Sequence, residues 1–180
     1  DIAIEMRLAG APFHQARRVQ VSIGPQSFPL ISKGGRLPSS PNEARFNLEY
    51  CVALAMLGAD VITPEDSEEV EAHLTRNALR DLISKIEVVS DPARNGFYDA
   101  RIVMIDHDER EYVVEASTAR GSSVNPLSDD DVLAKFRQLT RPLMSSEVID
   151  RYIQRMSRLS DADEVSWVIE EVADVSAGST

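Results

Sequence analysis

The sequence predicts an α+β domain in which helices pack against a small antiparallel sheet. Short segments alternate apolar and polar residues as strands do, while longer segments place apolar residues at helical spacing. Two of the strand-like segments are separated by a polar stretch that is typical of a hairpin turn. The chain has 180 residues, of which 43% are hydrophobic, and this is enough for one well-buried domain with at most a small appendage.

The strands are predicted at residues 18–23, 86–89, 99–105 and 111–117. In the first of these, Val19, Val21 and Ile23 alternate with polar residues. Residues 106–110 connect the last two strands and contain acidic side chains and a histidine that could bind a metal. Adjacent residues of a turn point in different directions, so we interpret this cluster as a polar hairpin turn.

Helices are predicted at residues 41–58 and 66–85, and the first should run through the core because its second half is almost entirely apolar. Further helices should begin at Ser128, in a capping box with Asp131, and at Ser145 or Ser146. A last helix is predicted at 164–172. As domain boundaries we expect a lead-in at residues 1–17, one α+β domain at 18–174 and a disordered tail at 175–180.

The loop at residues 24–41 contains four prolines and three glycines, and loops of this length are often functional. Lys33, Arg36 and Arg45 cluster near the helix start that follows, in a chain that is otherwise acidic. A helix start attracts carboxylates and phosphates. Tyr50 lies inside the apolar helix and needs a hydrogen-bond partner there. These features predict either an anion site or a solvated loop beside a core tyrosine.

Composition and the absence of motifs exclude several classes of function. The formal net charge of −11 argues against nucleic-acid binding, and no apolar run is long enough for a membrane span. The first residues do not resemble a signal peptide. Cys51 is the single cysteine, which fits a reducing cytosol and a core thiol. There is no phosphate loop, CxxC, HExxH or GxSxG motif. We place His73 on a solvated helix face, and His14 has no interpretation.

Two ordered motifs resemble the MmgE/PrpD family. Residues 38–53 read PSSPNEARFNLEYCVA, similar to the family pattern P-x-x-x-x-E-A-K/R-F/H-S-x-x-Y. Residues 121–128 read GSSVNPLS and are followed by Lys135 and Phe136, similar to G-x-x-x-x-P-L-S and a later K-F. The order and spacing agree over about residues 18–170. The positions that match the first motif are Pro38, Glu43, Ala44, Arg45, Phe46 and Tyr50.

The resemblance implies the smaller, carboxy-terminal α+β lid of a cytoplasmic, homodimeric lyase or isomerase. The family includes 2-methylcitrate dehydratase, cis-aconitate decarboxylase and iminodisuccinate epimerase, and uses no metal or organic cofactor. Its shared chemistry is proton movement beside a carboxylate of a small polycarboxylate. Most catalytic groups lie in a preceding helical domain, so the resemblance implies that these 180 residues are inactive alone. The sequence leaves open dehydration, decarboxylation and epimerisation.

The resemblance places Tyr50 at the active site, as the one catalytic residue carried by the motif. Lys33, Arg36, Arg45 and Asn47 are the expected substrate-binding residues. Asn47 stands where the family usually has Ser, and Glu49 where Pro is common, which leaves the substrate open. The alternative function is a stand-alone, non-catalytic α+β module for binding or assembly.

Overall fold

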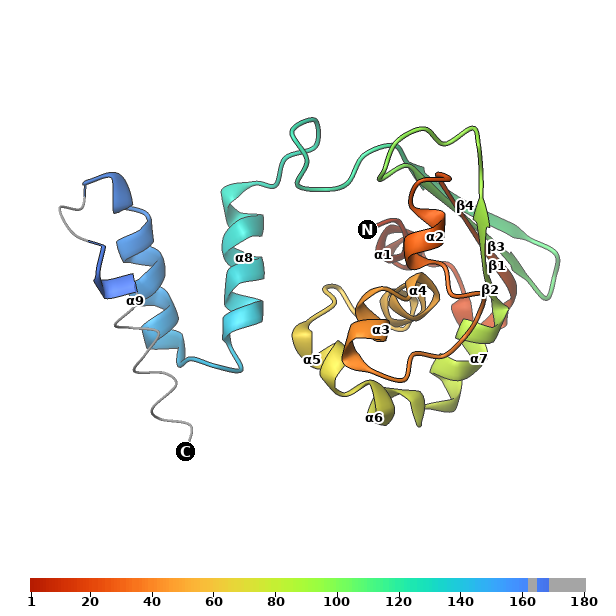
Figure 1. Cartoon of the computed structure of the whole chain (residues 1–180), viewed down its shortest axis with the longest axis horizontal. Coiled ribbons are helices and arrows are strands. Elements are labelled where there is room, and N and C mark those ends of the chain that lie inside the picture. Colours follow the sequence, from red (N-terminus) through yellow and green to blue (C-terminus); the bar gives the residue numbers. More distant parts are fainter. Residues whose placement is uncertain (162–164, 169–180) are drawn as a thin grey trace. The chain divides into compact units, whose positions relative to one another are not determined.

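The structure is a computed structural model that describes residues 1–161 and 165–168. The chain divides into two compact units, Asp1–Pro126 and Leu127–Thr180. The first unit contains the whole sheet and the helices that cover it, and the second contains a pair of helices (Figure 1).

The first unit is built on a four-stranded sheet with the strand order β2-β1-β3-β4. Its strands are β1 Ala16–Ile23, β2 Ile86–Ser90, β3 Ala100–Asp106 and β4 Glu111–Ala116. The pairs β1–β3 and β3–β4 are antiparallel, whereas β1 and β2 are parallel. The predicted α+β class is confirmed, and the sheet is mixed rather than purely antiparallel. A parallel pair needs a long crossover, which the helical segment between β1 and β2 provides.

Helices cover one face of this sheet (Figure 1). The predicted helix at 41–58 is two helices, because Asn47 has an extended backbone and starts a new helix there. The predicted helix at 66–85 is likewise divided into three. The helices of the first unit are α1 Ile2–Leu8, α2 Phe28–Ile31, α3 Pro41–Arg45, α4 Leu48–Met56, α5 Pro64–Glu68, α6 Val70–Leu74 and α7 Asn77–Lys85, with a 3-10 turn at Phe13–Gln15.

The core lies between the sheet and helices α1, α4 and α7. Helix α4 is the central element, and the predicted burial of its second half is confirmed. Helix α1, which belongs to the predicted lead-in, places Ala3 and Met6 in the same core. The sheet contributes alternate side chains, among them Val19, Val21 and Met104. Burial of this apolar surface is the main force that holds the unit together.

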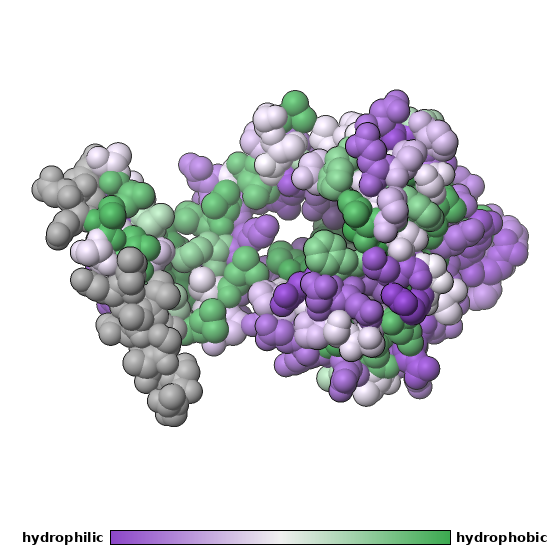
Figure 2. All heavy atoms as spheres, viewed as in Figure 1, coloured by the Kyte–Doolittle hydropathy of each residue, from purple (hydrophilic) through white to green (hydrophobic). Residues whose placement is uncertain are grey.

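The turn between β3 and β4 forms as predicted. The Asp106 carboxylate accepts hydrogen bonds from the backbone N–H groups of Asp108 and Arg110, both at 2.9 Å. Figure 2 shows hydrophilic side chains over this end of the sheet. Among the described residues, no group of three or more His, Cys, Asp or Glu side chains is arranged to hold a metal ion.

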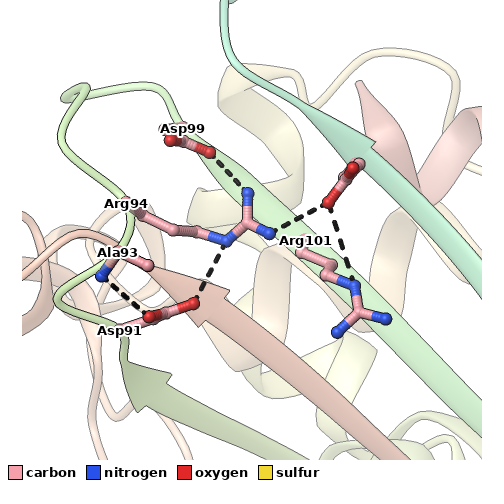
Figure 3. A network of polar contacts seen from close by, with 6 residues as sticks. Asp91, Ala93, Arg94, Asp99 and Arg101 are labelled. Atoms are coloured by element: carbon pink, nitrogen blue, oxygen red, sulfur yellow. Dashed lines mark hydrogen bonds and ion pairs between the residues drawn. The ribbon is translucent and has the colours of Figure 1, made fainter.

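Arg94 fixes the loop between β2 and β3 (Figure 3). Its guanidinium lies 2.5 Å from Asp99, 3.0 Å from Glu115 and 3.5 Å from Asp91. The loop packs closely against the end of β1, since a Cβ built on Gly24 would come within 2.8 Å of the Arg94 carbonyl oxygen. Glycine at position 24 therefore permits this close approach.

The second unit contains α8 Asp129–Thr140, α9 Ser146–Met156 and a 3-10 turn at Leu159–Asp161. The capping box of Ser128 with Asp131 is confirmed, and Ser145 caps α9. The acidic first turn of α8 complements its helix dipole. Phe136, Tyr152 and Trp167 form consecutive ring contacts.

Hydrophobic side chains lie along α8 (Figure 2). The predicted helix at 164–172 lies mostly outside the described residues, and the predicted tail at 175–180 lies entirely outside them. Within the described part of the chain, no helix is long and apolar enough to cross a membrane.

Candidate functional site

The first turn of α4 gathers three buried polar residues in an otherwise apolar helix. Asn47, Glu49 and Tyr50 are 2%, 0% and 1% exposed. Buried polar groups need hydrogen-bond partners. Asn47 and Glu49 both find partners in the loop at residues 33–36, whereas the partners of the Tyr50 hydroxyl lie in α5 and α6. The turn therefore connects α4 to the preceding loop on one side and to α5 and α6 on the other.

Asn47 holds both the start of α4 and the loop before it. Its side-chain oxygen accepts a hydrogen bond from the backbone N–H of Tyr50 at 2.9 Å, which caps the helix. Its side-chain nitrogen donates to the backbone carbonyl of Arg36 at 2.8 Å. Both ends of the amide are thus used inside the protein, so Asn47 positions the loop.

Glu49, two residues after Asn47, binds the backbone of the same loop. Its carboxylate accepts hydrogen bonds from the backbone N–H of Lys33, at 3.0 and 3.3 Å to the two oxygens, and from that of Gly35 at 3.3 Å. Negative charge in the first turn of a helix is also stabilised by the helix dipole. The sequence singled out Glu49 only as a departure from a motif, and its role in the loop is visible only in the structure.

The Tyr50 hydroxyl points into the protein. It donates a hydrogen bond to the Asp66 carbonyl at 2.6 Å and lies 3.1 Å from Nδ1 of His73. A hydroxyl has one proton, and the carbonyl can only accept, so His73 must be the donor in the second bond. Burial, followed by the negative charge of Asp66, raises the pKa of Tyr50 to about 12. The phenol is therefore neutral at pH 7.

His73 corrects an expectation from the sequence. The prediction of a solvated side chain was wrong, since the imidazole is only 19% exposed and its Nδ1 lies 3.8 Å from an Asp66 carboxylate oxygen as well as near Tyr50. The signal that could have found this contact is the need of a buried phenol for a partner. Tyr50 and His73 are 23 residues apart, so their meeting depends on how α4 packs against α6.

The predicted cations divide into two groups. Lys33 and Arg36 both lie near Glu43, and the closest contact of Arg36 to that carboxylate is 3.8 Å. Arg45 instead faces Glu68 at 3.9 Å. The Arg36 and Arg45 side chains are 69% and 51% exposed, and ion pairs of such exposed groups contribute little to stability. Both guanidinium groups therefore remain accessible to a ligand.

The surroundings of Glu43 favour the ionised form of its carboxyl group. The pKa of Glu43 is lowered, first by the backbone N–H of Ser39 and then by the Ser39 hydroxyl, with further contributions from Arg36 and Lys33. The Ser39 N–H and hydroxyl lie 2.8 and 2.7 Å from one Glu43 oxygen. The loop and the start of α3 thus stabilise the ionised form of a carboxyl group.

A separate hollow of about 310 Å³ lies in the first unit, and its lining is mainly apolar. Cys51 borders it and is only partly buried, packed against the core rather than within it, and burial raises the pKa of this thiol to about 11. Within the part of the chain that the structure describes, none of the five predicted site residues lines this hollow. The candidate site is therefore the surface formed by the loop and the start of α3, supported by the first turn of α4.

Comparison with known proteins identifies the family of the chain. Residues 1–159 match the sequence model of the family described as the MmgE/PrpD C-terminal domain. The chain is similar to human cis-aconitate decarboxylase, with 24% identity over 132 residues, which is 72% of this chain and 27% of the human protein. The mouse cis-aconitate decarboxylase is 22% identical over 132 residues, covering 72% of this chain and 26% of the mouse protein.

The match includes the predicted lead-in, where α1 packs into the core, and ends before the last residues of the chain. The chain spans about a quarter of the length of these two relatives. It belongs to the MmgE/PrpD family, and residues 1–159 correspond to the carboxy-terminal domain of that family.

Proposed function

We propose that this domain forms one wall of an active site for a small polycarboxylate, in a lyase or isomerase that uses no cofactor. A helical domain of the same family supplies the principal acid–base groups. The domain described here is the lid that closes over them. The name of the two similar decarboxylases gives their substrate as cis-aconitate, a tricarboxylate. Those relatives extend far beyond the matched stretch, which leaves room for a second domain.

The observation that carries this proposal is the stabilised carboxylate of Glu43. Two hydrogen bonds from Ser39 and the charges of Arg36 and Lys33 favour the ionised form of that group. A substrate carboxylate offers the same chemistry, and it would meet Lys33 and Arg36 at the same surface. Glu43 then competes with the substrate for these cations, so its neutralisation should strengthen binding.

The remaining predicted residues take supporting roles in this proposal. Arg45 binds a second carboxylate of the substrate, because its guanidinium is exposed and only loosely paired with Glu68. Asn47 acts through the backbone of the loop that it holds. Electrostatic contacts of this kind gain strength when a closing domain excludes water.

Tyr50 is the proposed catalytic residue, and its neutral phenol can donate a proton. Its hydroxyl is bonded to the Asp66 carbonyl, so it has to leave that partner before it can reach a substrate. The catalytic role of Tyr50 therefore requires that α5 moves when the two domains close.

The test is a titration of the ¹⁵N-labelled chain with cis-aconitate, followed by backbone amide shifts. We expect the shifts to concentrate at residues 32–47. The double variant Lys33→Gln/Arg36→Gln should bind roughly tenfold more weakly, a loss of about 1.4 kcal/mol. Glu43→Gln should bind more tightly than the wild type.

The matched control is Arg80→Gln/Arg110→Gln, which removes two positive charges from exposed positions elsewhere in the first unit. It should bind as the wild type does. Equal weakening in both double variants would mean that net charge, rather than this surface, attracts the ligand. Shifts confined to another region would overturn the proposal.

A further inference from the structure

We propose that Glu49 is a positioning residue that fixes the loop at residues 33–36 and thereby places Lys33 and Arg36 for the substrate. This inference rests on the proposed function, since it concerns the same surface. It adds a residue that does not touch the substrate and acts only through the backbone of the loop.

The first argument is the geometry of the clamp on the loop. Glu49 is fully buried, and its carboxylate accepts the N–H groups of Lys33 and Gly35 from inside the protein. Asn47 holds the carbonyl of Arg36 from the same helical turn. Three of the four residues at 33–36 are therefore tied by their backbones to the first turn of α4.

The second argument is the conformation of the loop. Gly34 and Gly35 have φ angles of +61° and +76°, in the left-handed region that favours glycine. An added Cβ would meet nothing within 4 Å at either position, so space does not require glycine there. The two glycines are needed for the backbone conformation itself, in which the N–H of Gly35 points to the Glu49 carboxylate.

The third argument is that the two sides of the loop have different environments. The backbone N–H groups of Lys33 and Gly35 face the buried carboxylate, while the Arg36 side chain is 69% exposed. Long cationic side chains lose much conformational freedom when they bind. A fixed backbone limits this loss to the side chains, so release of the clamp should weaken carboxylate binding without removing any cation.

The test compares Glu49→Gln with the matched control Glu87→Gln. Glu87 lies on β2 with 55% of its side chain exposed and pairs with Arg18, so the control removes the same charge from a solvent-facing position. Hydrogen exchange should become roughly tenfold faster at the Lys33 and Gly35 amides in Glu49→Gln, and affinity for cis-aconitate should fall by roughly the same factor. Neither quantity should change in Glu87→Gln.

A second variant tests the same inference in case Glu49→Gln disturbs the folding of α4. Gly35→Ala strains the loop from its own side and leaves every side chain of α4 in place, so it should give the same faster exchange and weaker binding. Wild-type affinity in a Glu49→Gln or Gly35→Ala protein whose loop amides exchange faster would overturn this inference alone. Unchanged exchange at the Lys33 and Gly35 amides would overturn it as well. Failure of the wild-type chain to bind cis-aconitate would overturn the proposed function together with it.

Discussion

Replacement of Tyr50 by Phe removes one hydroxyl group and leaves the ring in the core. The hydroxyl has two hydrogen-bond partners, the Asp66 carbonyl and Nδ1 of His73. Each such bond contributes about 0.5–1.5 kcal/mol net, so the free energy of unfolding should fall by about 1–3 kcal/mol. For a domain of this size, the melting temperature should fall by roughly 4–12 °C.

The assay is a thermal melt followed by circular dichroism, with Tyr98→Phe as the matched control. Tyr98 is 61% exposed, so loss of its hydroxyl should leave the melting temperature within about 1 °C of the wild type. A Tyr50→Phe protein that melts with the wild type would refute the internal position of the hydroxyl.

The same variant separates structure from catalysis in a two-domain enzyme. If Tyr50 also transfers a proton, the catalytic rate should fall by roughly 10²- to 10⁴-fold in Tyr50→Phe at a temperature where the protein is folded. A normal rate combined with a lowered melting temperature would limit Tyr50 to its structural role.

Three further predictions follow from close contacts and shifted pKa values. Gly24→Ala should lower the free energy of unfolding by about 1–3 kcal/mol, because its Cβ would come within 2.8 Å of the Arg94 carbonyl oxygen; a denaturant melt equal to that of the wild type would contradict this packing. Burial alone would raise the pKa of Asp106, but the backbone N–H groups of Arg110 and Asp108 outweigh it, and the pKa is lowered. The stability that this carboxylate contributes should therefore be lost as the pH falls below the ordinary pKa of an aspartate. Asp106→Asn should flatten the acid side of a plot of melting temperature against pH, whereas Asp108→Asn should not. Burial raises the pKa of Tyr50 to about 12, so the wild type should lose stability relative to Tyr50→Phe as pH rises from about 10 toward 12; parallel curves over that window would contradict the shift.

Local patterns in the sequence predicted the structures that form between residues close together in the chain. The capping box at Ser128 and the turn after Asp106 formed as expected, because both are settled within a few residues. The α+β class also followed from local periodicity. Parallel pairing of β1 with β2 did not, since it depends on the path of the whole segment between them.

The break between α3 and α4 has a signal that could have been read. Asn is a favoured N-cap, and Asn47 stands at the start of the most apolar stretch of the predicted helix. The contact of Glu49 with Lys33 had no comparable signal, and for Tyr50 the sequence indicated only that a buried phenol needs a partner, without identifying His73. The two contacts join segments 16 and 23 residues apart, and only the packing of the chain shows which buried polar group meets which partner.

One NMR sample tests the central claim, that this domain is a carboxylate-binding wall whose chemistry needs a second domain. The ¹⁵N-labelled chain is mixed with cis-aconitate, and both the protein amides and the vinyl proton signal of the ligand are followed over time. We predict shifts at residues 32–47 and a ligand signal that decays no faster than in a protein-free sample. Faster decay of the ligand would show that the 180 residues contain complete catalytic machinery, and unshifted amides at 32–47 would show that the carboxylate binds elsewhere or not at all.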